Sequence, residues 1–274
     1  MHAATPLAAD EADLERRFGG LRRLYGATGY ARLRAARVAV VGLGGVGSWA
    51  VEALARCGVA ALVLIDLDQV AESNVNRQVQ AVGATIGQAK AVALAERIAD
   101  IHPGCDVRVV EEWADDGNWP GLLPDDLPVD AVIDACDQSR AKLALAAWAR
   151  AQGVAYVVCG AAGGKRHPEK IEIADLSEAT HDPLLASLRQ RLRRDHGAPR
   201  QGRIGVRCVF SRETVAAPLT GAADGAGDEA ACELPGESDN TLNCHGYGST
   251  VMVTASVGFA AASEVVTQLL KKKQ

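Results

Sequence analysis

The segment RVAVVGLGGVGSWAVEALARCG, residues 37–58, sets the architecture of this 274-residue chain. It begins with a β-branched run typical of a buried parallel strand, passes through the turn GLGGVG, and ends in a helical pattern that stops at Gly58. Glycines let a backbone approach a phosphate closely, and a helix N-terminus offers free N–H groups. A strand, a glycine-rich turn and a helix in this order therefore predict a nucleotide-binding turn.

Strand-like and helix-like patterns alternate on the carboxyl side of this segment. Further apolar strand runs are predicted at residues 61–65, 107–110, 129–133 and 154–158. Helical patterns lie between them at residues 87–101 and 139–152. This alternation predicts an α/β fold with a Rossmann-like, mostly parallel sheet covered on both faces. The second half is less regular and predicts a mixed C-terminal extension: a strand at 171–176, an arginine-rich helix at 182–196 and a strand at 204–210.

Composition excludes several classes of protein. Apolar residues make up 48% and charged residues 23%, which excludes a disordered chain, collagen and a coiled coil. The seven cysteines are scattered and none forms a CxxC pair, so we expect neither a disulfide framework nor a structural zinc.

The N-terminus is acidic and lacks an apolar segment, which favours a cytoplasmic location. The apolar run at 250–262 is shorter than the ~20 residues of a membrane span. A buried helix is the favoured interpretation, and membrane association the alternative.

Polar residues after the second strand indicate which nucleotide binds. Asp66 follows the last glycine by 19 residues, where a carboxylate accepts hydrogen bonds from ribose hydroxyls. NAD would fit this feature equally well. Arg77 and Lys90 add cations, and Asn74 and Gln78 add amides, which suits the triphosphate of ATP.

Carboxylates also gather at the predicted carboxyl edge of the sheet. Asp66 and Asp68 form a D-x-D after the second strand, and Asp134 and Asp137 form D-A-C-D after the fourth, where such folds bind ligands and where Mg²⁺ could be held. Each polar residue has a structural alternative: a solvated helix lysine at Lys90, a loop salt bridge at Arg77 and a helix cap at Asp137. Their joint occurrence in this order favours ATP.

Longer motifs carry a family resemblance. GLGGVGS, LIDLDQVAESNVNRQ, GQAKA and DACD together resemble the ubiquitin-activating-enzyme-like superfamily, which includes the ThiF and MoeB adenylating enzymes. RRFGGLRRLYG (16–26), VRCVFSRE (206–213) and CHGYGSTVMVTASVGF (244–259) resemble its TcdA (CsdL) branch, the tRNA threonylcarbamoyladenosine dehydratases. The resemblance runs from about residue 16 to residue 270. It implies one adenylating domain (16–270), with an ATP-binding core at 36–160 and a substrate and tRNA side at 161–270. We expect a flexible N-terminus at 1–15. Residues 220–240 are rich in glycine and acidic residues and contain no basic residue, which indicates a mobile loop.

The resemblance implies roles for the motif residues. It assigns catalysis to Asp137, Arg77 and Lys90, with Asp137 also holding Mg²⁺. It assigns nucleotide binding to Gly42, Gly44, Gly45, Gly47, Asp66, Asp68, Asn74, Arg77, Gln78, Lys90 and Asp134.

Partners follow from the same resemblance. It implies a homodimer in which an N-terminal arginine enters the partner subunit's ATP site, and Arg17 and Arg23 are both candidates. A sulfur-transfer partner, a cysteine desulfurase, is left open. Relatives with a thioester cysteine place it after the fifth strand, where Cys208 is the candidate; the alternative is a small apolar core residue.

One concentrated basic region contrasts with the net charge of −5. Its arginines are Arg189, Arg191, Arg193, Arg194, Arg200 and Arg203. Such a cluster is typical of a surface that binds a phosphate backbone, here tRNA, and a solvated helix is the alternative.

The function expected is ATP-dependent dehydration, by cyclisation, of threonylcarbamoyladenosine next to the tRNA anticodon, through adenylation of the threonyl carboxylate. ThiF- or MoeB-like adenylation of a sulfur-carrier protein is the alternative. An NAD-dependent oxidoreductase and a non-catalytic RNA-binding protein are further alternatives.

Overall fold

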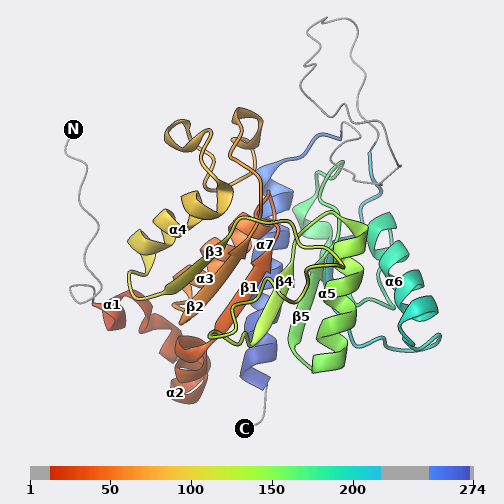
Figure 1. The fold of residues 1–274 in the computed structure, drawn as a ribbon, viewed down its shortest axis with the longest axis horizontal. Coiled ribbons are helices and arrows are strands. Elements are labelled where there is room, and N and C mark those ends of the chain that lie inside the picture. The colour runs from red at the N-terminus through yellow and green to blue at the C-terminus, as the bar shows by residue number, and fades with distance from the viewer. Residues whose placement is uncertain (1–12, 217–246, 272–274) are drawn as a thin grey trace, which may run out of the picture.

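A seven-stranded sheet forms the centre of the computed structural model, which describes residues 13–216 and 247–271 (Figure 1). The strand order is β3-β2-β1-β4-β5-β7-β6. All neighbouring pairs are parallel except β6 and β7. The strands are β1 (Arg37–Val41), β2 (Ala61–Ile65), β3 (Asp106–Val110), β4 (Ala131–Asp134), β5 (Ala155–Cys159), β6 (Ile171–Asp175) and β7 (Arg207–Ser211). The predicted α/β fold with a mixed C-terminal extension is confirmed.

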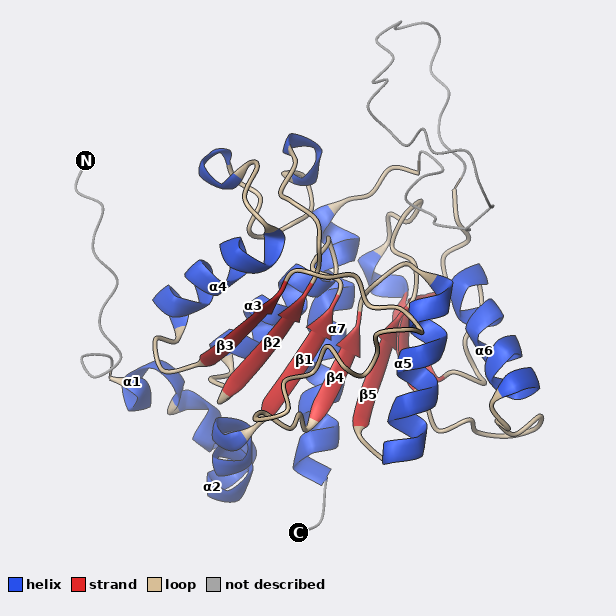
Figure 2. Ribbon diagram, viewed as in Figure 1, coloured by secondary structure: helices blue, strands red, loops and turns tan. Residues whose placement is uncertain are grey.

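Helices cover both faces of the sheet (Figure 2). Alternate side chains of β1 face opposite ways: Val38 and Val40 join one core, and Ala39 and Val41 join the other. The first core is closed by α2 (Gly20–Ala35), α3 (Gly47–Arg56), α4 (Lys90–Ile101) and α7 (Val251–Lys271). The second is closed by α5 (Ser139–Gln152) and α6 (Pro183–Asp195). Burial on both faces explains why the central strands read as continuous apolar runs.

Two elements start three residues later than predicted, for local reasons. Helix α4 begins at Lys90 and not at residue 87, because Gly87 has φ +85° and Ala89 forms a bridge with Gln69. Strand β7 begins at Arg207 and not at residue 204, because Gly205 turns the chain with φ +81°.

The N-terminal region is helical from residue 14. Helix α1 (Leu14–Phe18) is capped by Asp13, whose carboxylate accepts from the backbone N of Arg16, and α2 follows it. Residues 1–12 and the predicted acidic loop at 220–240 lie outside the described residues.

The C-terminal apolar stretch forms the 21-residue helix α7, the one helix in the described chain long and apolar enough to cross a membrane. Within the protein, 56% of its apolar window is buried. Gly258 lets α7 approach α3 closely, because a Cβ atom there would meet Trp49 Cβ at 2.9 Å and Ala50 N at 3.0 Å. The helix therefore serves as a core element of this fold.

Candidate nucleotide-binding site

The predicted motifs meet at the carboxyl edge of the sheet, where β1 and β4 lie side by side and their following helices cover opposite faces. This is the topological switch point at which open α/β sheets bind ligands. The glycine turn follows β1, and the D-A-C-D loop follows β4. The two loops are in direct contact, because a Cβ atom on Gly42 would lie 2.7 Å from the backbone N of Cys136.

The four glycines of the turn do different things. Gly42 has φ +85° and packs on the β4 loop, and a Cβ atom on Gly47 would fall on the Gly42 carbonyl oxygen. Gly45 faces the Arg77 side chain, whose Cδ would be 3.3 Å from an added Cβ. A Cβ atom on Gly44 would meet no described atom within 4 Å. Two of these glycines are thus required by the fold, and Gly44 borders open space that a ligand can reach.

Asp66 and Lys90 come together beside the turn, as the sequence predicts. Asp66 accepts hydrogen bonds from the backbone N of Leu43 at 2.6 Å and from that of Asp68 at 2.8 Å. Burial raises the pKa of the Asp66 carboxyl, and the positive charge of Lys90 opposes that rise. Lys90 is buried and its Nζ lies 2.6 Å from Asp68 Oδ2. The alternative of a solvated helix lysine is therefore wrong.

The segment from Asn74 to Gln78 is held against the turn by its backbone. Asn74 is buried and accepts from the backbone N of Ala71 at 3.0 Å. The Trp49 indole donates to the Arg77 carbonyl at 3.0 Å. The Arg77 guanidinium donates to the Ser73 carbonyl at 2.7 Å, and burial lowers the pKa of Arg77. No ion pair of Arg77 is found within the described chain, so it is not the loop salt bridge of the structural alternative.

Gln80 escaped the sequence analysis although it joins the two halves of the site. Its Nε2 donates to the Leu43 carbonyl at 3.0 Å and to Gln78 Oε1 at 3.1 Å. Its own Oε1 is buried without a hydrogen-bond partner among residues 13–216 and 247–271. The spacing R-Q-x-Q at residues 77–80 was the one sequence feature that could have indicated Gln80. A single glutamine does not predict a role until its neighbours in the fold are known.

The structure corrects the role expected of Asp134. Its carboxylate is fully buried and bonded on both oxygens: Lys142 Nζ lies 2.8 Å from Oδ1, and the Tyr156 hydroxyl donates to Oδ2 at 2.6 Å. Lys142, also fully buried, donates to the Cys159 carbonyl at 3.0 Å. Asp134 thus ties the ends of β4 and β5 to α5 instead of presenting an oxygen to a nucleotide. Lys142 gave no signal, because it lies in a run of helical alanines and leucines.

Asp137 lies three residues beyond this cluster and is half-buried at the carboxyl edge. The helix cap that follows is Gln138, which makes no side-chain cap bond, so the alternative of Asp137 as N-cap is wrong. No group of three His, Cys, Asp or Glu side chains able to hold a metal occurs in the described residues. One carboxylate fits Mg²⁺ here, because Mg²⁺ is commonly bound by one or two carboxylates together with substrate phosphates.

Cys208 is a core residue. It is fully buried in β7, its Sγ lies 3.5 Å from the Ala174 carbonyl, and burial raises the pKa of its thiol to about 12. A thiol in this state is a poor nucleophile at neutral pH, because the thiolate is the reactive form. The structural alternative is confirmed.

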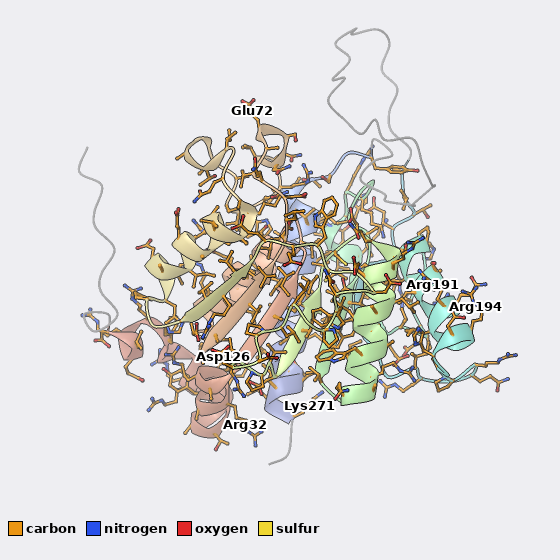
Figure 3. All side chains as sticks on the ribbon, in the orientation of Figure 1. Arg32, Glu72, Asp126, Arg191, Arg194 and Lys271 are labelled. Atoms are coloured by element: carbon orange, nitrogen blue, oxygen red, sulfur yellow. The ribbon has the colours of Figure 1, made fainter. Side chains whose placement is uncertain are left out.

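The arginines of the basic region divide into two groups by their exposure. Figure 3 labels one of each group, Arg191 and Arg194, on α6. Three are half-buried and donate to backbone carbonyls: Arg189 to Leu176 and Ala179, Arg191 to Ser139, and Arg193 to Pro199. Arg194, Arg200 and Arg203 are exposed, and Arg194 pairs with Asp195 at 2.7 Å. The first group donates to backbone carbonyls around α6. The second group is exposed on the surface, where a large polyanion can contact it.

The N-terminal arginines also differ. Arg17 donates to the carbonyls of Asp100 at 2.8 Å and Ile101 at 2.7 Å, so it is engaged at the end of α4 in its own subunit. Arg23 is exposed, and no hydrogen bond or ion pair of its side chain is found in the part of the chain that is described. Of the two candidates, Arg23 is the one available to a partner.

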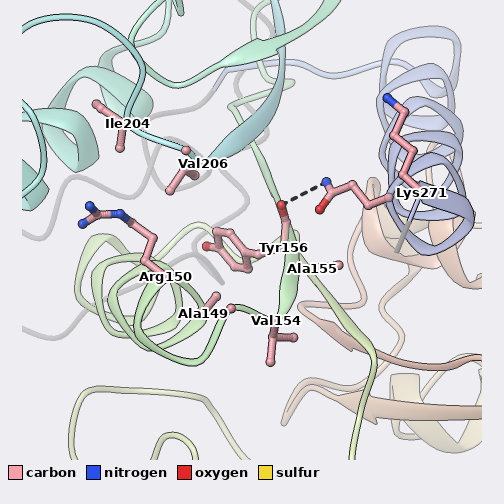
Figure 4. A pocket seen from close by; sticks show the side chains of 11 residues that line it. Ala149, Arg150, Val154, Ala155, Tyr156, Ile204, Val206 and Lys271 are labelled. Carbon is pink, nitrogen blue, oxygen red and sulfur yellow. Dashed lines mark hydrogen bonds between the residues drawn. The ribbon is translucent and has the colours of Figure 1, made fainter. Parts of the chain in front are cut away.

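A cavity of about 650 Å³ lies elsewhere, at the amino ends of β5 and β7 (Figure 4). Arg150, Tyr156 and Lys271 are among the residues that line it. None of the predicted nucleotide-binding residues borders it, so it is not the nucleotide site.

Comparisons with known proteins show the family of this chain. The model of the ThiF family matches residues 17–274. The chain is 40% identical to a tRNA threonylcarbamoyladenosine dehydratase of Escherichia coli, over 93% of this chain and 94% of that protein. It is 39% identical to one of Haemophilus influenzae, over 94% and 95%. The crystal structure of the Escherichia coli enzyme with ATP has a TM-score of 0.80 at 39% identity, covering 94% of this chain and 96% of that chain. Its complex with AMP has a TM-score of 0.79.

Proposed function

Since the chain belongs to the ThiF family, and within it to the tRNA threonylcarbamoyladenosine dehydratases, we propose that it dehydrates threonylcarbamoyladenosine in tRNA at the expense of ATP. The observation that carries this proposal is the meeting of four features at one switch point: the glycine turn, Asp66 bonded to that turn, the Lys90–Asp68 ion pair and the Asp137 loop. A solved relative with this fold holds ATP, and another complex of it holds AMP.

A carboxylate oxygen is a poor leaving group, so the threonyl carboxylate must first be activated. A carboxylate oxygen of the threonyl group attacks the α-phosphorus of ATP, and pyrophosphate leaves. The neighbouring carbamoyl group then attacks the acyl carbon and loses a proton, and the acyl–oxygen bond breaks to release AMP. The oxygen lost in the net dehydration leaves in AMP, so no covalent intermediate with a protein nucleophile is needed. This agrees with the buried state of Cys208.

Charge on the phosphates must be neutralised during this transfer. Lys90 is presented from the first turn of α4, already desolvated, and it exchanges Asp68 for a phosphate oxygen. Arg77 lies over Gly45 with its backbone fixed by Trp49. Bound Mg²⁺, held by Asp137, would add positive charge at the same phosphates.

Further parts of the proposal concern partners. We place tRNA on the exposed arginines Arg194, Arg200 and Arg203, and a second subunit where Arg23 can reach the partner's ATP site. We also propose a cytoplasmic location and a cysteine desulfurase as a partner.

A single-turnover incubation with Mg²⁺-ATP and tRNA carrying threonylcarbamoyladenosine tests the function. We expect the nucleoside to lose the mass of one water and AMP to form, and Asp137→Ala to abolish both. Asp116→Ala, an exposed aspartate remote from the site in sequence, serves as the matched control. AMP without a change in the tRNA would move the substrate to a carrier protein or another carboxylate. No AMP would refute the enzyme assignment.

A further inference from the structure

A second cavity, of about 330 Å³, lies beside the start of α6. Its volume is within the range of about 300–1,000 Å³ of small-molecule pockets. We propose that this cavity receives the modified purine of the substrate, turned out of the anticodon loop. This inference rests on the proposed function and adds the place where the substrate nucleotide sits.

The cavity is on the same edge of the sheet as the nucleotide site. Asp182, in its wall, accepts a hydrogen bond from the backbone N of Ala161 at 2.8 Å, two residues after β5 ends. Asp137 lies three residues after β4 ends. Strands β4 and β5 are parallel neighbours with Asp134 opposite Val158, so the two loops emerge side by side. A base in the cavity would therefore lie next to the site of adenylation.

The lining suits a base better than a phosphate. Apolar wall atoms come from Ala179, Pro183, Ala186 and Val215, and hydroxyls come from Thr180 and Thr214. Arg189 is the one cation among the described lining residues, and its guanidinium donates to the carbonyls of Leu176 at 3.2 Å and Ala179 at 2.7 Å. Asp182 accepts a hydrogen bond from the backbone N of Leu185, in the first turn of α6, at 3.0 Å, so this N–H is not available to a phosphate. Apolar walls with a few hydrogen-bonding groups are typical of sites for unstacked RNA bases.

His181 stands at the rim of this cavity in an uncommon backbone conformation. Its φ is +58°, and no other non-glycine residue in the described chain has a positive φ. Such residues concentrate at ligand sites. Its ring is exposed, with Nδ1 3.0 Å from Thr180 Oγ1. An exposed imidazole beside an apolar cavity offers a face on which an extruded base can stack.

Binding of two anticodon stem-loop RNAs tests the proposal: one carries threonylcarbamoyladenosine, the other adenosine at the same position. Fluorescence anisotropy without ATP should show wild-type protein binding the modified RNA at least ~10-fold more tightly, as expected of a site built to hydrogen-bond its ligand. Ala186→Phe fills the cavity and should remove this preference. Gln190→Phe, one turn along α6 and exposed, should keep it. ATP-dependent thermal stabilisation should persist in both variants, which shows that they are folded.

His181 gives an independent set of variants. His181→Gly tolerates the positive φ but lacks the ring, so it should lose the preference for the modified RNA while remaining folded. His181→Phe keeps a stacking face and should retain part of it. If wild type has no preference, or Ala186→Phe keeps a full one, the cavity is not the base site. If wild type prefers the modified RNA yet forms no AMP and no dehydrated nucleoside, the proposed function fails and the binding site stands.

Discussion

Replacement of Lys142 by methionine tests how the site is held together. Lys142 and Asp134 are both fully buried, with Nζ and Oδ1 2.8 Å apart. Burial lowers the pKa of Lys142, but the groups around its ammonium, first among them Asp134, together raise it by more, so the lysine is charged in the folded protein. Lys142→Met keeps the length of the side chain but leaves the Asp134 carboxylate with the Tyr156 hydroxyl and the Cys136 groups as its remaining partners.

Breaking a buried ion pair by removing one partner costs about 3–5 kcal/mol. We expect this loss in the free energy of unfolding of Lys142→Met, measured from the urea midpoint at an unchanged m value. For a domain of this size it corresponds to a melting temperature lower by roughly 6–20 °C. The rate of dehydration should also fall, because the same pair positions the loop that carries Asp137.

The double variant Asp134→Asn/Lys142→Met distinguishes this explanation from a simple loss of packing. With both charges gone, no unpaired charge stays buried, so the double variant should be no less stable than Lys142→Met alone. A loss below about 1 kcal/mol in Lys142→Met, or losses of the two single variants that simply add, would refute the reasoning.

Three further predictions concern the turn, a buried histidine and the basic region. Gly42→Ala should lower the free energy of unfolding by about 1–3 kcal/mol, because Gly42 has φ +85° and contacts the β4 loop. Gly44→Ala should leave the melting temperature unchanged and weaken ATP binding measured by calorimetry, because its Cβ atom would meet no described atom within 4 Å. Burial and the neighbouring Arg34 and Arg17 charges lower the pKa of His102 to about 4 from 6.5. Below pH ~6.5 the unfolded chain binds a proton at this histidine before the folded protein does, so the free energy of unfolding should fall by about 3 kcal/mol towards pH 4. Urea unfolding measured against pH should show this fall, and His102→Gln should remove it. Arg203→Ala should weaken tRNA binding and reduce its salt slope by roughly 0.7–0.9 with an unchanged melting temperature. Arg189→Ala should lower that temperature instead, since its bonds to two carbonyls are lost.

Local patterns were enough to predict most of the fold. The strand at 37–41, the glycine turn and the helix that follows depend on neighbours a few residues away, so their signals are complete within the sequence segment. The order of motifs then places Asp66, Lys90 and Asp137 after their strands, and in a parallel sheet those strands end at the same edge. The starts of β7 and α4 were wrong, because Gly205 and Gly87 turn the chain where apolar periodicity suggests regular structure.

What the sequence could not show depends on partners distant along the chain. Asp134 and Asp137 look alike in D-A-C-D, and only the approach of Lys142 and Tyr156 makes the first a buried structural residue. The carbonyls at the end of α4 engage Arg17 and leave Arg23 exposed. The cavity beside α6 is walled by residues from 179–189 and 214–215, which fold together although their spacing carries no pattern. Burial and charge pairing across the sheet are properties of the packed chain, and these decide which of several similar side chains can meet a ligand.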